Sequence, residues 1–259
     1  MKLEHKNILI IGATGDLGAA VARRLNSENT NIVLVGRSKD KLAALATDLP
    51  KSIQIIADIN HEKDREKIFQ KTLEKFNQID VVINIAGLMS FNEFILETDE
   101  ITNSLFQTNV ISPMLLNKKI AKHMIENSSG SIVNIGSIFG SIPFALFSSY
   151  SATKAALKAY SESLRRELEG TGVNVSYIAP RAIRTKFNSN AINEMNNKFK
   201  ISMDDPDFVA NEIINAIELG KKDKYIGYPE KLFVRINALM PRLVDKALKK
   251  QNQEAKKFI

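Results

Sequence analysis

The first 25 residues contain the pattern that most restricts the fold of this chain: an apolar strand, a glycine-rich loop and a helix in immediate succession. Residues 7–11 predict a short buried strand, Gly12-Ala-Thr-Gly15-Asp-Leu-Gly18 follows, and residues 19–25 predict a helix. Glycines let a backbone approach a phosphate closely, and the N-terminus of a helix offers unpaired N–H groups to it. We therefore expect this loop to bind the pyrophosphate of a dinucleotide.

The rest of the chain alternates between apolar strands and longer helical segments. Residues 80–87 form a near-continuous apolar run, which is typical of a parallel strand buried on both faces. The other expected strands are 31–36, 53–57, 131–135, 173–178 and 224–228, and the expected helices are 62–76, 99–124, 148–168, 187–199 and 204–219. We expect one doubly wound α/β domain of the Rossmann type over residues 1–228, with a parallel sheet, helices on both faces and ligands at the carboxyl ends of the strands.

Composition excludes several functional classes. With 259 residues, 44% hydrophobic and 25% charged, the chain has the profile of an ordinary soluble globular protein. It contains no cysteine, which excludes disulfides and thiol catalysis, and its three histidines are scattered, so we expect no metal site. No apolar run approaches the roughly 18 residues of a membrane-spanning helix, and we expect a cytoplasmic protein. Nucleic-acid-binding motifs are lacking, so we expect no nucleic-acid partner.

The net charge of +7 is concentrated in the last forty residues or so of the sequence. Residues 1–220 contain equal numbers of basic and acidic residues, whereas residues 221–259 hold 11 basic and 4 acidic ones. Within residues 231–250 apolar residues alternate with cations, and Pro241 divides the segment into two short helices. Such a basic amphipathic extension, residues 229–259, suits a peripheral contact with an anionic membrane, a cover over a substrate cleft or an oligomer interface, and these alternatives stay open. From residue 251 onward we expect a frayed end.

Three polar residues stand out in the otherwise apolar, Phe-rich stretch from residue 137 to 154. Tyr150 and Lys154 are four residues apart at the start of a predicted helix, so both side chains lie on one helix face. A nearby positive charge stabilises a phenolate and lowers the pKa of tyrosine from its ordinary value near about 10. Ser137 ends a predicted strand, where its hydroxyl can hold a substrate oxygen beside the phenol. The spacing predicts acid/base chemistry at neutral pH.

Together with the glycine loop and the segment Asn84-Ile-Ala-Gly87, these residues resemble the short-chain dehydrogenase/reductase family, in its single-domain form with a Tyr-x-x-x-Lys motif. The resemblance covers about residues 6–228. It implies reversible hydride transfer between a nicotinamide cofactor and a carbonyl/alcohol pair. It also implies that Ser137 binds the carbonyl oxygen and Tyr150 donates the proton. Lys154 would lower the pKa of the phenol and hold the nicotinamide ribose, and Asn109 would anchor a water for proton relay.

The resemblance also implies which residues contact the cofactor. In NAD-selective relatives an acidic residue at the end of the second strand binds the ribose, but here Gly36 occupies that place and Arg37 follows. A guanidinium is the matching partner for the 2′-phosphate of NADP(H). Two alternatives stay open. Arg37 would face solvent without binding a phosphate, and Asn84 would have a structural role without contacting the cofactor. The complete set of expected NADP(H) contacts is Gly12, Thr14, Gly15, Asp16, Leu17, Gly18, Arg37, Asp58, Ile59, Asn84, Ala86, Gly87, Tyr150, Lys154, Pro180, Ile183 and Thr185.

Three positions depart from the family pattern. Asp16 stands where glycine is usual, which changes the loop spacing to Gly-x-x-Gly-x-x-Gly, and Ile85 replaces an asparagine. Arg181 replaces a glycine and, with Arg184 and Lys186, brings three cations beside the expected cofactor. These cations would either meet anionic groups of the substrate, such as the phosphates of a coenzyme A thioester, or form ordinary surface charge.

The substrate side is predicted to be apolar. The amphipathic helix expected at 187–199 falls where the family has its substrate lid, at about residues 185–203. Apolar residues expected to face it are Leu88, Met89, Phe91, Phe139, Phe144 and Phe147. We expect NADPH-dependent reduction of a lipophilic ketone, such as a 3-oxoacyl thioester or a steroid- or retinoid-like carbonyl, to a secondary alcohol, or the reverse, with a role in lipid metabolism.

Two other functions stay open at this point. One is a sensor or scaffold that binds NADP(H) without turnover. The other, suggested only by the glycine spacing, is a sugar-nucleotide epimerase or dehydratase, although that branch usually carries an extra substrate domain. Assembly as a homo-oligomer is also left open.

Overall fold

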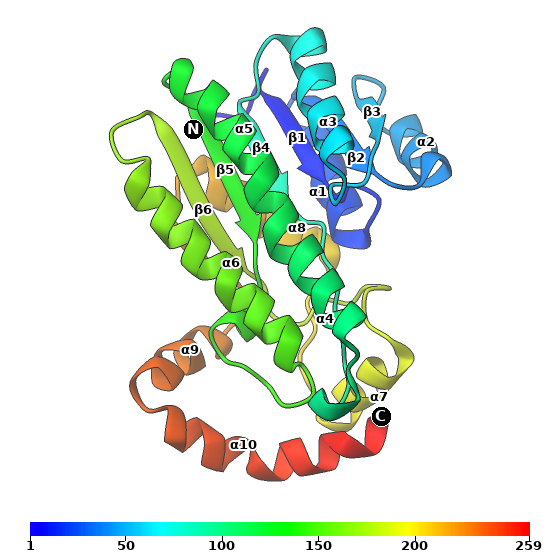
Figure 1. Ribbon diagram of the computed structural model, residues 1–259, viewed down its shortest axis with the longest axis vertical. Coiled ribbons are helices and arrows are strands. Elements are labelled where there is room, and N and C mark those ends of the chain that lie inside the picture. The colour runs from blue at the N-terminus through cyan, green and yellow to red at the C-terminus, as the bar shows by residue number, and fades with distance from the viewer.

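Each strand of this protein pairs in parallel with its neighbours, and the result is one seven-stranded sheet in the order β3-β2-β1-β4-β5-β6-β7 (Figure 1). The computed structural model describes residues 1–259. The strands are β1 Asn7–Ile11, β2 Asn31–Gly36, β3 Ile53–Ile56, β4 Val81–Asn84, β5 Gly130–Ile135, β6 Val173–Ala179 and β7 Asp223–Tyr225. The predicted doubly wound parallel sheet is confirmed.

The central strands are buried on both faces because their side chains alternate between two hydrophobic cores. In β1, Ile8 and Ile10 enter the core on one face of the sheet, whereas Leu9 and Ile11 enter the core on the other. Alternating direction is the ordinary geometry of a strand, and a strand covered on both faces must be apolar at every position. This requirement explains the continuous β-branched runs in the sequence.

Helices cover both faces of the sheet. The first core is closed by α1 Asp16–Asn26, α2 Lys39–Thr47 and α8 Pro206–Glu218. The second is closed by α3 Glu62–Phe76, α5 Ser112–Glu126 and α6 Ser148–Glu167. Helix α2 was not expected from the sequence, because its nine residues include only two buried leucines and so show little amphipathic pattern.

The segment predicted as one helix over residues 99–124 has an irregular centre. It consists of α4 Asp99–Phe106, a π turn at Gln107–Ile111 and α5. π turns inside helices carry an extra residue and often occur at functional sites. Asn109 lies within this turn, so the helix is irregular at this polar residue.

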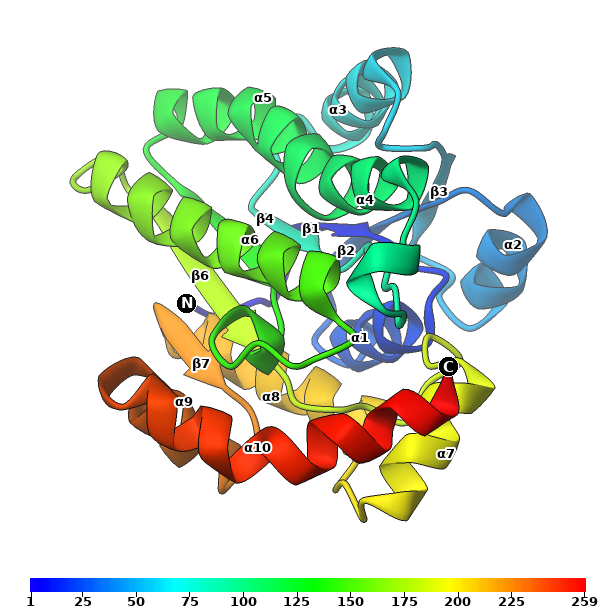
Figure 2. The same cartoon turned by 60° about the horizontal axis from the view of Figure 1, so that its bottom comes forward.

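Three helices lie beyond the carboxyl ends of the strands (Figures 1 and 2). They are α7 Asn190–Lys198, α9 Glu230–Leu239 and α10 Pro241–Ala255. Pro241 divides the last two, as predicted, but the expected fraying from residue 251 is wrong. The helix continues to Ala255, which is buried, and a 3₁₀ turn at Lys256–Phe258 follows. None of the helices combines the length and the apolar character needed to cross a membrane.

Candidate active site

A single large cavity of about 850 Å³ opens at the carboxyl ends of the strands. Its inner part follows the glycine loop after β1 and the ends of β2, β3 and β4. Its outer part is bounded by the loop before α6, by α7 and by the inner sides of α9 and α10. Ligands of doubly wound proteins bind in this position, at the carboxyl ends of two adjacent strands whose following helices cover opposite faces of the sheet.

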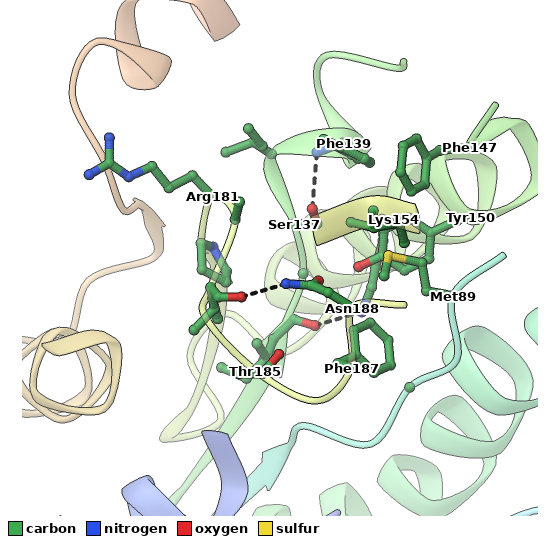
Figure 3. Close-up of a pocket in the computed structure, with 18 of the residues that line it drawn as sticks. Met89, Ser137, Phe139, Phe147, Tyr150, Lys154, Arg181, Thr185, Phe187 and Asn188 are labelled. Carbon is green, nitrogen blue, oxygen red and sulfur yellow. Dashed lines mark hydrogen bonds between the residues drawn. The ribbon is translucent and has the colours of Figure 1, made fainter. Parts of the chain in front are cut away.

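The structure brings Ser137, Tyr150 and Lys154 together in the middle of this cavity (Figure 3). Ser137 follows β5, and the other two residues lie in the first two turns of α6. Tyr150 and Lys154 are 7% and 5% exposed, so their polar ends are withdrawn from bulk water. The fold therefore brings Ser137, Tyr150 and Lys154 together, as predicted.

Ser137 is held from two sides. Its hydroxyl oxygen accepts a hydrogen bond from the Phe139 amide at 3.1 Å, which leaves the hydroxyl proton free to be donated elsewhere. The Tyr177 hydroxyl, on β6, donates to the Ser137 carbonyl oxygen at 3.1 Å and accepts from the Ser137 amide at 3.4 Å. Gly136 has to be glycine, because a Cβ there would lie 2.2 Å from the Tyr177 ring. Sequence reasoning missed Tyr177 and Gly136, whose only signals are a tyrosine inside an apolar strand and a glycine next to Ser137.

Burial shifts the pKa values of both titratable groups. Removal from water raises the pKa of Tyr150 to about 12, and a hydrogen bond with the Ser137 hydroxyl offsets the rise only in part. The same effect lowers the pKa of Lys154 to about 8. The Lys154 ammonium donates to the Ile135 carbonyl oxygen at 3.1 Å and lies 5.7 Å from the centre of the Tyr150 ring. Burial thus has the largest effect on the pKa of Tyr150, and the expected lowering of that pKa by Lys154 stays a prediction.

Asn109 lies directly behind these groups. Its Oδ1 accepts from the Leu88 amide at 2.7 Å, and its Nδ2 donates to the Leu88 carbonyl oxygen at 2.9 Å and to Thr153 Oγ1 at 3.0 Å. The side chain thus fastens the loop after β4 to α6. A Cβ on Gly87 would lie 3.2 Å from Asn109 Oδ1 and 3.7 Å from Lys154 Nζ, which shows how closely both approach that loop. The binding of a relay water at Asn109 stays a prediction.

The inner part of the cavity has the features of a nucleotide crevice. Gly12 has a φ of +90°, and a Cβ there would lie 2.7 Å from the Ala86 amide nitrogen, so the loops after β1 and β4 meet as closely as backbones can. The N-terminus of α1 has no side-chain cap at Gly15, and its free N–H groups are available to a phosphate. Of the predicted cofactor residues, sixteen line the cavity: Gly12, Thr14, Gly15, Asp16, Leu17, Gly18, Arg37, Asp58, Ile59, Ala86, Gly87, Tyr150, Lys154, Pro180, Ile183 and Thr185.

Asn84 is the exception and needs a correction. It is 4% exposed and does not line the cavity. Its Nδ2 donates to Asn117 Oδ1 at 3.0 Å and to Asn134 Oδ1 at 2.9 Å, and Asn134 donates in turn to Ser161. These residues join two neighbouring strands to α5 and α6 through buried amides, so the structural alternative describes Asn84 better.

Asp16, which departs from the family pattern, has a defined partner. Its carboxylate accepts a hydrogen bond from the Lys186 amide at 2.6 Å. Lys186 lies in the loop between β6 and α7, close to Thr185, while Asn188 in the same loop donates to the Ile183 carbonyl oxygen. The first turn of α1 is therefore tied to the start of the segment expected to act as the substrate lid. The sequence shows an unusual residue at position 16 but not this partner.

The structure also redefines the role of Arg181. Its guanidinium donates to both oxygens of Asp204, at 3.0 and 2.7 Å, and to both oxygens of Glu230, at 3.3 and 3.2 Å. The head group points away from Ser137 and Tyr150 (Figure 3). With two carboxylates already bound, Arg181 is neither a free substrate-phosphate ligand nor plain surface charge, and both expectations are wrong for this residue. It joins the end of β6 to the segment before α8 and to the start of α9.

The outer part of the cavity is apolar, as predicted. Phe139 packs edge-on against Phe147 and Tyr150, with ring centroids 4.9 and 6.0 Å apart, and lies 4.8 Å from Phe144. Phe91 lies 4.9 Å from the Phe147 ring but does not itself line the cavity. Leu88 and Met89 do line it, opposite Ile192 and Met195 of α7, and apolar residues of α9 and α10 close the far side: Phe233, Ile236, Leu243, Val244, Ala247, Leu248 and Ala255.

Comparison with known families agrees with this geometry. A family model described as short chain dehydrogenase matches residues 6–196. The chain belongs to the short-chain dehydrogenase/reductase family. Members of this family bind NAD(P)(H) and act on the CH–OH or C=O groups of small molecules, and the predicted family is confirmed.

Curated relatives of this chain include dehydrogenase/reductase SDR family member 7B of Danio rerio, 35% identical over 58% of this chain and 51% of the relative. Another is the uncharacterized oxidoreductase YxnA of Bacillus subtilis, 30% identical over 71% of this chain and 53% of the relative. The 3-oxoacyl-acyl-carrier-protein reductase of Escherichia coli is 32% identical over 46% of this chain and 49% of the relative. The chain thus spans about half the length of the curated relatives it matches.

Solved structures show the same fold over nearly the whole chain. A short-chain dehydrogenase from Streptomyces avermitilis has a TM-score of 0.82 at 26% identity, covering 97% of this chain and 99% of that one. A 3-ketoacyl-(acyl-carrier-protein) reductase from Brucella melitensis, complexed with NADH, also has a TM-score of 0.82, at 22% identity, covering 88% of this chain and 99% of that one.

Proposed function

We propose that this dehydrogenase catalyses the NADPH-dependent reduction of a lipophilic ketone to a secondary alcohol, or the reverse reaction. One observation carries the proposal. The Ser137 hydroxyl and the protonated Tyr150 phenol lie where a polar nucleotide crevice meets an apolar chamber. A carbonyl carbon placed there would be next to a cofactor on one side and a proton donor on the other.

The residues present fit a nicotinamide dinucleotide. The crevice offers the uncapped N-terminus of α1 to a pyrophosphate, and Thr185 and Ile183, which line the same cavity, would hold the nicotinamide end. When bound, the cofactor supplies the hydride. The protein supplies the position of the carbonyl group and the proton.

Each of the polar residues has a defined task in the reductive direction. Ser137 donates its hydroxyl proton in a hydrogen bond to the carbonyl oxygen, since its own oxygen is already occupied by the Phe139 amide. Tyr150, which keeps its proton at neutral pH because burial raises its pKa, transfers that proton to the developing alkoxide. Lys154 holds a positive charge next to the phenolate that remains, and Asn109 fixes the loop after β4, which lines the cavity.

The preference for NADP(H) rests on Arg37. The Arg37 side chain is 71% exposed at the rim of the crevice, which Lys41 also lines. The position where NAD-selective relatives have an acidic residue is Gly36 here, so no carboxylate at that position binds the ribose hydroxyls. The Arg37 guanidinium lies 3.8 Å from the Asp58 carboxylate, so it is only loosely held and can turn to a 2′-phosphate. We expect kcat/KM to favour NADPH over NADH, and Arg37→Ala to abolish most of this preference. A preference that survives the substitution would remove Arg37 from cofactor selection.

For the substrate we propose a 3-oxoacyl thioester, with a steroid- or retinoid-like ketone as the variant. The apolar chamber supports either, and the curated 3-oxoacyl-acyl-carrier-protein reductases support the first. An apolar lining does not suit the hydroxyl-rich sugar of a nucleotide sugar, because the hydroxyls would lose their hydrogen bonds to water. This disfavours the epimerase or dehydratase alternative.

The test is NADPH oxidation with 3-oxoacyl thioesters of increasing chain length, using wild type, Tyr150→Phe and, as a matched control, Tyr228→Phe, whose residue is 79% exposed. We expect turnover in wild type and the control, and a loss of about 10²–10⁴-fold in Tyr150→Phe, the usual contribution of a general acid. Equal activity in all three proteins would remove Tyr150 from the reaction. NADPH binding without turnover of any carbonyl substrate would favour the sensor alternative.

We also propose a peripheral membrane contact through the outer side of residues 231–250. Leu239 and Met240 at the turn between α9 and α10 are 81% and 52% exposed, and the exposed Arg235 and Arg242 flank them. Exposed apolar groups among cations suit an anionic bilayer surface. The test is co-sedimentation with phosphatidylcholine vesicles with and without phosphatidylserine. Salt-sensitive binding to the anionic vesicles that Leu239→Ser weakens is expected, and no binding to either vesicle would contradict the contact.

A further inference from the structure

Helix α10 spans the open end of the active-site cavity instead of packing on the body of the protein. Figure 2 shows it running from α9 across the molecule toward α7. Of its fifteen residues only Ala255 is buried, although the helix is strongly amphipathic. A helix with an apolar stripe normally buries that stripe against a core. Here the stripe of Val244, Ala247, Leu248, Gln251 and Ala255 lines the cavity.

The two ends of α10 are fixed. At its carboxyl end Ala255 packs in a cluster with Phe147, Tyr150 and Met195. Phe258, just beyond, meets the Phe199 ring edge-on at 6.2 Å. Beside it, Lys256 forms an ion pair with Glu93 at 3.3 Å.

At its amino end, α10 continues from α9, which is itself anchored. Val234 is 8% exposed, Asn237 Nδ2 donates to the Ser141 carbonyl oxygen at 2.9 Å, and Glu230 is bound by Arg181. The hydrogen bond to Ser141 and the ion pair with Arg181 both join α9 to the region of the active site. Ser141 follows the turn that carries Phe139, and Arg181 follows β6. The middle of α10 is thereby held at a fixed place over the chamber.

The orientation of the helix separates its two faces. Arg242, Lys246, Lys249 and Lys250 are exposed and do not line the cavity, whereas the apolar stripe does. This stripe is therefore turned away from any membrane that the outer side contacts. Of the three alternatives open for the extension, a cover over the substrate cleft is the one that accounts for the inner face of α10.

We propose that α10 is the distal wall of the substrate site and that Val244, Ala247 and Leu248 contact the apolar end of a long-chain substrate, so that they set the chain length the enzyme accepts. This inference rests on the proposed reduction of a lipophilic ketone. A hydrocarbon chain running from Tyr150 through the Phe-lined part of the chamber reaches α10 and completes the packing of its stripe. Each methylene that gains this contact increases affinity by about fourfold, until the chain meets the wall.

The decisive variant is Ala247→Phe, which puts an aromatic ring into the chamber from the wall. Lys246→Ala is the matched control, since Lys246 is the adjacent residue and faces solvent. With 3-oxoacyl thioesters of four to sixteen carbons, we expect kcat/KM of wild type and Lys246→Ala to rise with chain length. Ala247→Phe should retain activity on the four-carbon substrate and lose about tenfold or more on the longest ones. Leu248→Ala, which deepens the chamber, should shift the optimum toward longer chains.

A binding experiment separates this inference from the proposed reaction. The probe is cis-parinaric acid, an eighteen-carbon fluorescent fatty acid, titrated into wild type, Ala247→Phe and Lys246→Ala, each checked for intact folding by circular dichroism and for NADPH binding. We expect the probe to bind wild type and Lys246→Ala equally and Ala247→Phe about tenfold or more weakly. This result without thioester turnover would leave α10 as the wall of an apolar site and overturn the proposed reaction alone. Equal chain-length profiles or equal probe binding in all three proteins, or no probe binding by wild type, would overturn the inference.

Discussion

At the scale of single residues, the site is prepared by burial more than by charge. Tyr150 and Lys154 share one turn of α6, yet desolvation moves their pKa values in opposite directions, each toward the neutral form. The phenol remains protonated at pH 7, whereas the ammonium lies close to its titration point. Lys154 is therefore the group whose charge changes near physiological pH.

This difference predicts the pH dependence of the reductive reaction. Because the pKa of Lys154 is about 8, reductive kcat/KM should be steady below that pH and fall above it as the ammonium loses its proton. Lys154→Arg keeps its charge over this range and should lack the decline, whatever its absolute activity. The measurement is kcat/KM with NADPH from pH 6 to 10. The same decline in both proteins would assign it to another group.

Tyr177 is expected to act as a positioning residue. Its hydroxyl forms two hydrogen bonds with the Ser137 main chain, so Tyr177→Phe should leave that segment less fixed and lower kcat about tenfold without changing the NADPH dissociation constant. Tyr225→Phe is the control, since the Tyr225 hydroxyl pairs with Ser141 at 2.9 Å instead. An equal loss of kcat in both variants would indicate general destabilisation and not positioning of Ser137.

At the scale of structural elements, side-chain hydrogen bonds tie segments of the substrate side to α1 and to the sheet. Asp16 joins α1 to the loop before α7, and Arg181 joins β6 to α9. Both residues replace glycines of the family pattern, so the two departures from that pattern have a common structural effect. Each adds a side chain that holds a segment around the substrate chamber.

Two substitutions of Asp16 distinguish the effect of its negative charge from the effect of its hydrogen bond to the Lys186 amide. Asp16→Asn keeps an oxygen that can accept from the Lys186 amide but removes a negative charge next to the expected pyrophosphate. It should tighten NADPH binding by about two- to fivefold, as measured by fluorescence titration. Asp16→Ala removes the acceptor as well, and hydrogen exchange should accelerate in residues 183–188. Unchanged exchange in this second variant would mean that the contact does not hold the loop.

Arg181 should contribute to stability and to the placement of α9. Arg181→Met leaves the carboxylates of Asp204 and Glu230, which are 7% and 20% exposed, without a cation, and should lower the free energy of unfolding by about 2–4 kcal/mol. Glu230→Gln leaves the Asp204 pair intact and should cost less, while proteolysis and hydrogen exchange in α9 and α10 increase. Urea unfolding and exchange measurements distinguish the two. Equal losses of stability would show that the α9 contact dominates.

At the scale of the whole molecule, the buried Lys154 lowers the stability of the fold. Its pKa falls from 10.5 in an exposed side chain to about 8, a difference equivalent to roughly 3 kcal/mol. The folded state thus binds the proton less tightly than the unfolded state does. This contribution therefore destabilises the protein below pH 8 and disappears as the pH rises toward 10.5.

Lys154→Met is consequently expected to be more stable than wild type at pH 7, by about 1–3 kcal/mol, although it should be inactive. The lost hydrogen bond to the Ile135 carbonyl oxygen reduces the gain. The difference in the free energy of unfolding between Lys154→Met and wild type should narrow between pH 8 and pH 10, where wild-type Lys154 becomes neutral. Urea unfolding of both ligand-free proteins at several pH values measures it. A gap independent of pH would mean that the charge of Lys154 is not what destabilises the fold.

The sequence alone determined the parallel sheet, the glycine loop and the grouping of Tyr150 with Lys154, because each follows from local patterns. Strands buried on both faces have to be apolar throughout, and Tyr150 and Lys154 share a helix face at a separation of four residues. Family motifs then located sixteen of the seventeen predicted cofactor residues along one cavity.

Only the tertiary structure decided what depends on partners distant in the chain. Arg181 finds its carboxylates 23 and 49 residues away, Asp16 meets the Lys186 amide 170 residues away, and Asn84 turns from the cofactor to a buried amide network. The carboxyl end of α10 is ordered because Ala255 and Phe258 pack against residues of other elements. The pKa shifts of Tyr150 and Lys154 likewise follow from burial, which no local pattern encodes. The amphipathic pattern of α10 predicted a helix with an apolar side, but the fold alone turned that side toward the substrate chamber.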